Sequence, residues 1–308
     1  MRAIEVNNLK KTFKPRLFSK TKAIDALKGI SFDINEGEIF GLLGPNGAGK
    51  TTTINILSGI LKEDSGNVSY FGKPISEEIK HIINVSSAYS WLTSELTVVQ
   101  NLMIYGKIYN VKELDRKIES LVKQFGIYDI RNRKILTMSS GQKTRANLCK
   151  GLINDPKILL LDEATIGLDP DIAHEIRNII KNLKTTILFT SHNMEEVEEL
   201  CNRVAFLSKG TILKMDTPQN LTRLIKEQIV VIHFYPSENS IEQALNKLKA
   251  NIVSIKEDEV VLNVDNTKDE LHNLLHPILR RGFKIKDLSI KKPKLNDVFI
   301  KIARGEIK

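Results

Sequence analysis

The feature that most constrains this chain is a glycine-rich loop at residues 44–51, GPNGAGKT, which follows an apolar segment at 39–43 and precedes a helical pattern at 52–60. Glycine allows backbone dihedral angles that other residues avoid, so successive N–H groups in such a loop can turn inward around an anion. The positive end of the dipole of the following helix favours the same negative charge. A strand, this loop and a helix in that order predict a phosphate-binding loop in an α/β fold.

The residues of the loop predict a nucleotide as the ligand. The ammonium of Lys50 is expected to reach the β- and γ-phosphates, and the hydroxyl of Thr51 is expected to bind Mg²⁺. The other residues expected to contact the nucleotide here are Gly44, Pro45, Asn46, Gly47, Ala48, Gly49 and Thr52.

Two acidic residues follow a second apolar segment. The run at 158–161, Ile-Leu-Leu-Leu, is typical of a buried parallel strand, and ligands of open α/β sheets lie at the carboxyl ends of strands. We therefore expect Asp162 to hold Mg²⁺ through water and Glu163 to orient or deprotonate the attacking water. A third apolar strand at 186–190 leads to His192, whose imidazole can reach the γ-phosphate.

Helical patterns occupy the middle of the chain. Between about 97 and 124, apolar residues recur at spacings of three and four, which predicts two helices separated near Asn110 and inserted into the α/β core. A polar turn at 138–142, MSSGQ, is expected to enter a helix at 143–153. Such a turn suits an anionic ligand, but a serine in it can equally cap the helix without one.

The bulk properties set limits on the protein class. With 308 residues, 41% hydrophobic and 27% charged, the chain can form two folded domains. Its apolar runs are far shorter than the roughly 20 residues that cross a bilayer, and the start carries no signal-peptide pattern, so we expect a cytoplasmic protein. The net charge of +9 is compatible with nucleic acid, anionic lipid or a solvated surface and does not choose among them. Near the N-terminus we expect short strands at 3–6 and 30–34, separated by a basic loop at 14–22.

Together these motifs resemble the nucleotide-binding subunit of the ATP-binding cassette (ABC) family, over about residues 3–220. The loop at 44–51 resembles the Walker A motif of that family. The other similarities are the signature at 138–142, the Walker B motif at 161–163, the D-loop at 167–169, the switch histidine at His192 and the adenine-stacking aromatic at Phe13.

The resemblance implies a P-loop NTPase fold, with a RecA-like core, an antiparallel β subdomain and a helical insertion. It implies ATP and Mg²⁺ as ligands, with Lys50, Glu163 and His192 as the catalytic residues. Two copies, or this chain and a paired ABC subunit, would pack head to tail, so that Ser139 and Gly141 of one copy close on the ATP held by the other. Further nucleotide contacts implied in this way are Ser140, Gln142 and Asp169.

The sequence also departs from the family pattern. The family has a glutamine on a loop before the helical insertion, whereas this chain has no glutamine before Gln100. The expected place falls near Ser86, Ser87 or Ala88, and the sequence leaves open what replaces that ligand. Ala164 stands where the family usually has proline.

The last part of the chain, 221–308, has a different order of elements from the first domain at 1–220. We expect strands at 229–234, 252–255, 259–264 and 284–290 and helices at 241–250 and 268–280. This β-α-β-β-α-β order predicts a small α+β domain of the ferredoxin-like type. It is similar to the C-terminal domain on ATPase subunits of ABC-2 exporters, whose tail motif resembles LNDVF at 295–299.

These observations favour an ATPase subunit that powers a membrane exporter from the cytoplasmic face of the membrane, with permease subunits on separate chains and no nucleic acid partner. A soluble ABC ATPase acting on nucleic acid or ribosomes is the main alternative, because the basic charge permits it. A regulatory subunit that binds ATP and barely hydrolyses it is a third. The transported molecule cannot be read from this chain.

Overall fold

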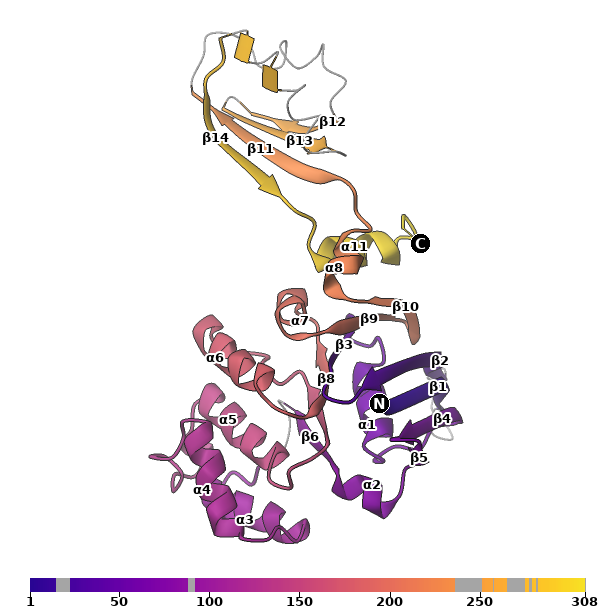
Figure 1. The fold of residues 1–308 in the computed structure, drawn as a ribbon, viewed down its shortest axis with the longest axis vertical. Helices are drawn as coiled ribbons and strands as arrows, with labels where there is room; N and C mark the ends of the chain where they lie inside the picture. The colour runs from indigo at the N-terminus through magenta and orange to yellow at the C-terminus, as the bar shows by residue number, and fades with distance from the viewer. Residues whose placement is uncertain are drawn as a thin grey trace. The chain divides into compact units, whose positions relative to one another are not determined.

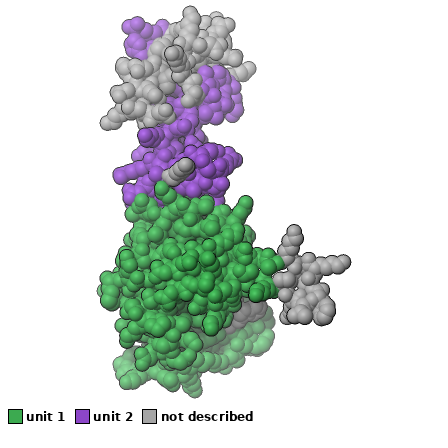
Figure 2. Space-filling model, turned by 90° about the vertical axis from the view of Figure 1, so that its right-hand side faces the viewer, with its two compact units in different colours: residues 1–218 green, residues 219–308 purple. Residues whose placement is uncertain are grey.

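The computed structural model describes residues 1–14, 23–87, 92–235, 251–256, 258–264, 275–276, 279–280 and 282–307. The chain divides into two compact units, 1–218 and 219–308, which Figure 2 colours separately. The helix expected at 241–250, most of the helix expected at 268–280 and most of the basic loop expected at 14–22 lie outside the described residues.

A six-stranded sheet forms the core of the first unit, in the order β10-β9-β3-β8-β7-β6 (Figure 1). Its strands are β3 (Ile39–Leu43), β6 (Ile83–Ser87), β7 (Ile158–Asp162), β8 (Thr186–Ser191), β9 (Arg203–Ser208) and β10 (Thr211–Asp216). All pairs are parallel except β9 with β10. Every residue of β3 and β7 is buried, as their apolar sequences predict for parallel strands covered on both faces.

An antiparallel sheet in the order β2-β1-β4-β5 packs against this core. Its strands are β1 (Arg2–Phe13), β2 (Ile24–Asn35), β4 (Ser65–Tyr70) and β5 (Lys73–Pro74). The strands expected at 3–6 and 30–34 exist but the predictions were too short, since β1 and β2 each have 12 residues. Register shifts along the β1–β2 pair interrupt the two-residue alternation on which sequence assignment depends.

The two helices of the insertion are α3 (Val98–Ile108) and α4 (Leu114–Gln124), so the predicted pair separated near Asn110 is confirmed. Both contact α5 (Ser140–Gly151). The remaining helices of this unit are α1 (Lys50–Leu57), α2 (Glu77–His81), α6 (Pro170–Lys181), α7 (Met194–Leu200) and a 3₁₀ turn at Ile135–Thr137.

Two helices begin earlier than the sequence analysis expected. Helix α1 starts at Lys50 rather than at residue 52, and α5 starts at Ser140 rather than at residue 143. In α5 the Ser139 hydroxyl accepts a hydrogen bond from the Gln142 N–H, and the Gln142 side chain accepts one from the Ser139 N–H. This capping box draws the polar turn into the first turn of the helix.

The second unit contains a four-stranded antiparallel sheet in the order β12-β13-β11-β14. Its elements are α8 (Pro218–Thr222, at the division between the units), β11 (Gln228–Phe234), β12 (Asn251–Ile255), β13 (Glu259–Val264), β14 (Ile285–Lys291) and α11 (Leu295–Ala303). The four predicted strands are therefore confirmed. Alternate residues of β11, Val230, Ile232 and Phe234, are buried in the core of this unit.

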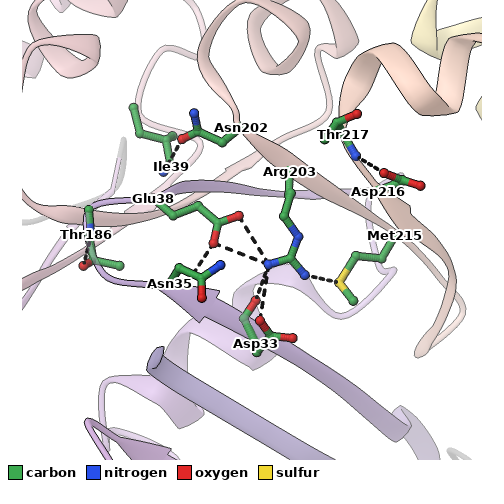
Figure 3. A network of polar contacts seen from close by, with 11 residues as sticks. Asp33, Asn35, Glu38, Ile39, Thr186, Asn202, Arg203, Met215, Asp216 and Thr217 are labelled. Atoms are coloured by element: carbon green, nitrogen blue, oxygen red, sulfur yellow. Dashed lines mark hydrogen bonds and ion pairs between the residues drawn. The ribbon is translucent and has the colours of Figure 1, made fainter. Parts of the chain in front are cut away.

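A polar network joins the two sheets of the first unit at the amino ends of β3 and β9 (Figure 3). The Arg203 guanidinium lies 3.3 Å from the Asp33 carboxylate and 3.4 Å from the Glu38 carboxylate, and it also contacts the Met215 sulfur at 3.7 Å. The Asn35 N–H donates to Glu38 at 2.7 Å. These contacts tie β2, β3, β9 and β10 together.

Within the described ranges, every helix is too short or too polar to reach across a bilayer.

Candidate functional site

The candidate site lies where parallel strands of the core sheet end. In the strand register Leu43 of β3 is opposite Ser191 of β8, and Asp162 of β7 is opposite Thr190 of β8. Because these strands are parallel, the segments that follow them meet at one edge of the sheet. The glycine-rich loop, the acidic pair and the histidine predicted from the sequence are brought together there.

The glycine-rich loop connects β3 to α1 in a conformation that needs glycine at two positions. A Cβ atom on Gly44 would lie 2.1 Å from the Leu207 carbonyl oxygen, so only glycine fits that approach. Gly49, directly before α1, has φ of +114° and would place a Cβ atom 2.7 Å from the Ala26 carbonyl oxygen. The loop therefore packs closely on its neighbours and enters the helix with free N–H groups at its positive end.

Lys50 is the first residue of α1 and is only 5% exposed. Its ammonium donates a hydrogen bond of 2.7 Å to the Gly44 carbonyl and lies 3.4 Å from the Glu163 carboxylate. The side chain therefore folds back over the loop that precedes it, toward the end of β7.

The two acidic residues have different surroundings. Asp162 ends β7, and its Oδ1 accepts a 2.6 Å hydrogen bond from the Thr190 hydroxyl. Glu163 has φ of +51°, a strained value for this residue type that turns the chain sharply after the strand. Its carboxylate lies 3.4 Å from the Lys50 ammonium and 3.5 Å from Nδ1 of His192. Glu163 therefore sits between the loop lysine and the histidine after β8.

A cavity of about 730 Å³ opens over Lys50, Asp162 and Glu163, whereas His192 lines a neighbouring cavity that Glu163 also borders. Among the residues that the sequence predicts for the site, those lining the 730 Å³ cavity are Phe13, Asn46, Gly47, Gly49, Lys50, Thr51, Thr52, Asp162 and Glu163. Phe13 ends β1 and is 44% exposed, so a face of its ring is available for stacking on a planar base. One cavity thus combines an exposed aromatic, a phosphate-type loop and two carboxylates.

Several lining residues had no signal in the sequence. Ile24, Asp25, Ala26 and Lys28 come from the start of β2, Ile166 follows the acidic pair, and Lys209 comes from the turn between β9 and β10. The Gly210 N–H donates to the Ala48 carbonyl at 3.0 Å, which holds this turn against the glycine-rich loop. These contacts are long-range, so no local pattern marks these residues as part of a site.

The signature and D-loop residues lie elsewhere. Ser139, Ser140, Gly141, Gln142 and Asp169 do not line the cavity that contains Lys50. Ser139, Ser140 and Asp169 are exposed, whereas Gly141 is buried, and a Cβ atom there would lie 2.7 Å from the Ile172 side chain.

At the place expected for the family glutamine, Ser86 and Ser87 belong to β6 and do not line the cavity. Ser87 is opposite Asp162 in the strand register. Ala88 is outside the described residues.

Comparison with known proteins identifies the family. The family described as "ABC transporter" matches residues 27–166, and the "ATP-binding protein DrrA1-3-like, C-terminal domain" matches residues 217–303.

Full-length relatives agree with these matches. The linearmycin resistance ATP-binding protein LnrL of Bacillus subtilis (strain 168) is 31% identical over 97% of this chain and 98% of its own length. The Nod factor export ATP-binding protein I of Rhizobium etli is 31% identical over 100% of this chain and 95% of its own length.

Solved structures show the same cassette. The ADP conformation of an ATP-binding cassette of an ABC transporter is 26% identical, with a TM-score of 0.63, and the alignment covers 71% of this chain and 92% of that structure. The resemblance inferred from the motifs and the P-loop NTPase fold are both confirmed. The chain belongs to the ABC transporter family, as one of its ATP-binding and ATP-hydrolysing subunits.

Proposed function

We propose that this chain powers a membrane exporter from the cytoplasmic face of the membrane, with the membrane-spanning permease on separate chains. The proposal rests on one observation: Lys50, Thr51, Asp162 and Glu163 line the same cavity. The names of the two full-length relatives, one a resistance protein and one an export protein, support export over action on nucleic acid.

In the proposed reaction the residues bind and orient ATP and move one proton. The loop N–H groups and the Lys50 ammonium bind the β- and γ-phosphates, and Phe13 stacks on the adenine. Glu163 accepts the proton of the attacking water, and His192, 3.5 Å away, contacts the γ-phosphate. Catalysis in such a site is mostly positioning and charge stabilisation.

The residues at the loop fit Mg²⁺, which prefers oxygen ligands. The Thr51 hydroxyl and the Asp162 carboxylate line the same cavity, and Thr190 occupies only Oδ1 of Asp162, which leaves Oδ2 without a protein partner among the described residues. We therefore assign Thr51 and Asp162 as the residues that would hold the ion. When bound, Mg²⁺ would neutralise charge on the β- and γ-phosphates.

A head-to-tail dimer accounts for the separate position of the signature. Ser139 is exposed at the start of α5, and its segment lies outside the Lys50 cavity of its own chain. The positive end of that helix suits the γ-phosphate of ATP bound to a second copy. Asp169, exposed before α6, is proposed to join the same interface.

The test is Glu163→Gln, which keeps the size of the side chain and removes the base. We expect kcat for ATP hydrolysis to fall roughly 100- to 10,000-fold, the usual contribution of a general base, while ATP binding persists. ATP-dependent dimers should accumulate and be visible by size-exclusion chromatography. Unchanged turnover would remove Glu163 from its role.

The partner is tested by purification from detergent-solubilised membranes. Co-purification of an integral membrane protein is the expected result. Salt-sensitive binding of RNA or DNA without a membrane partner would instead support the nucleic-acid alternative.

A further inference from the structure

We propose that Glu196, a residue of α7, is a positioning residue. Its buried carboxylate holds together two catalytic loops, the segment after β7 that carries Glu163 and the segment after β8 that carries His192. Glu196 is 7% exposed and lies outside the cavity that contains Lys50. The inference rests on the proposed function, because it takes Glu163 and His192 as the groups that must be aligned.

One oxygen of Glu196 binds both loops. Its Oε2 accepts a 2.8 Å hydrogen bond from the Thr165 hydroxyl and a 3.0 Å hydrogen bond from the Ser191 hydroxyl. Thr165 follows Glu163 by two residues, and Ser191 directly precedes His192. With the 3.5 Å contact between Glu163 and His192, a closed ring runs from Glu196 through Thr165, Ala164 and Glu163 to His192 and Ser191.

The direction of these hydrogen bonds is fixed by chemistry. An ionised carboxylate only accepts, so both hydroxyls must donate to it. The Ser191 oxygen in turn accepts from the Asn193 N–H at 2.9 Å, which ties the start of the loop to the entrance of α7. The Arg177 guanidinium lies 3.4 Å from Oε1 of Glu196 and compensates its buried charge.

One side of these loops borders open space. A second cavity, of about 330 Å³, lies beside them and is lined by Glu163, Thr165, His192 and Glu196, among others. Ile166, which directly follows Thr165 and also lines this cavity, is 37% exposed. The Glu163 N–H donates to the Thr190 carbonyl at 3.1 Å and so joins the two loops at their start, and the hydrogen bonds to Glu196 add a second, directional connection beside the open space.

The ring predicts a specific kinetic signature. Within the described residues, Glu163 is its only member that contacts the glycine-rich loop, at 3.4 Å from Lys50, and the hydrogen bonds to Glu196 lie away from that loop and from Phe13, so breaking those hydrogen bonds should leave ATP affinity intact. The ring aligns the groups that act on water and on the γ-phosphate, and a misplacement of about 1 Å can cost roughly 100-fold in rate. The loss should therefore appear in kcat and not in KM.

The main test compares Thr165→Val with Thr165→Ser in the full-length protein. Valine keeps the shape of threonine but removes the hydroxyl, and serine keeps the hydroxyl. We expect Thr165→Val to lower kcat roughly 10- to 100-fold with KM for ATP within about twofold, whereas Thr165→Ser keeps kcat within about threefold. Ser191→Ala should repeat the loss from the other side of the ring.

Glu199→Gln is the matched control on the same helix. Glu199 accepts a 2.7 Å hydrogen bond from Arg177 and lies 3.4 Å from His174, and among the described residues it contacts neither catalytic loop. We expect Glu196→Gln to lower kcat at least tenfold, because an amide presents a donor to Arg177 or to one of the hydroxyls. Glu199→Gln should leave kcat unchanged.

Two results separate the inference from the proposed function. Suppose that the wild type hydrolyses ATP and that Glu163→Gln does not. Equal kcat values for Thr165→Val and Thr165→Ser would then overturn the role of Glu196 and leave the proposed function standing. A wild-type protein that binds ATP without hydrolysing it, in the presence of its co-purified partner, would overturn both.

Discussion

Polar residues lie at or next to both ends of the core strands β3, β8 and β9, and the two ends are built differently. At the amino ends the polar groups satisfy one another: Asn202 accepts from the Ile39 N–H at 2.8 Å, and Thr186 accepts from the Gly37 N–H at 3.0 Å (Figure 3). At the carboxyl ends of β3 and β8, and of β7 between β8 and β6, polar groups border cavities of about 730 and 330 Å³. One end is closed, and the other is open to a ligand.

Two glutamates make the difference concrete. Glu38, 8% exposed at the amino end of β3, is held by Arg203 and by the Asn35 N–H. Glu163, after the carboxyl end of β7, contacts Lys50 and His192 and borders both cavities. A carboxylate surrounded by its own donors contributes to stability, whereas one that borders open space can act on water. Polar residues at the amino ends of these strands therefore stabilise the fold, whereas those at the carboxyl ends form the candidate site.

The largest expected effect is at the open end, from Lys50→Ala. Loss of a buried, hydrogen-bonded charge that we propose binds the phosphates should weaken ATP binding at least about 100-fold. Isothermal titration calorimetry of the full-length protein measures this directly.

The control for this variant is Lys62→Ala, which removes an exposed lysine outside the cavity. It should leave ATP affinity unchanged. Normal ATP binding by Lys50→Ala would show that the glycine-rich loop is not the phosphate site.

A smaller effect, of a different kind, is expected at the closed end from Arg203→Met. This change leaves Asp33 and Glu38 without their cation, and breaking a buried pair of this type costs up to 3–5 kcal/mol. Because the Arg203 side chain is 24% exposed, we expect a loss of about 2 kcal/mol in unfolding free energy. Urea unfolding of the full-length protein measures it.

Arg116→Met is the matched control, since Arg116 forms an exposed ion pair with Glu113 and should contribute almost nothing. ATP affinity should survive in both variants. A parallel loss of ATP affinity in Arg203→Met would contradict the separation of the two ends.

Local patterns predict much of this fold because its main elements carry strong local signals. The apolar runs that form β3, β7 and β8 have no polar interruption, so their assignment as buried strands needs no tertiary information. The extent of β1 and β2 could not be predicted in the same way, because bulges shift the side-chain alternation along them.

The site is predictable mainly where function requires residues that are consecutive in sequence. The glycine-rich loop and the pair Asp162 and Glu163 are such residues. The isolated residues Phe13 and His192 are expected from their places at strand ends and from the family resemblance. Lys209, Thr190 and Glu196 act through contacts between distant segments, and each is an ordinary polar residue in its local sequence. Their roles follow from the strand register, which sequence spacing does not determine.

Lys150 extends the comparison, because it is a half-buried cation without the carboxylates that Arg203 has. It lies on α5, its ammonium donates to the Val85 carbonyl at 2.8 Å, and it is 5.3 Å from the Tyr105 ring. Within the described residues no carboxylate pairs with it. Burial therefore lowers the pKa of Lys150 from its ordinary value of 10.5 to about 8.

The smallest predicted effect follows from this pKa. The folded chain releases the Lys150 proton near pH 8, whereas the unfolded chain holds it until about pH 10.5, so the unfolded state binds more protons between these values and stability rises with pH across them. Lys150→Met lacks this contribution. The stability of the wild type relative to Lys150→Met should therefore increase by about 1 kcal/mol between roughly pH 7.5 and 9.5, measured by urea unfolding. Parallel pH curves for the two proteins would mean that the Val85 carbonyl and the Tyr105 ring stabilise the ammonium as well as a carboxylate would.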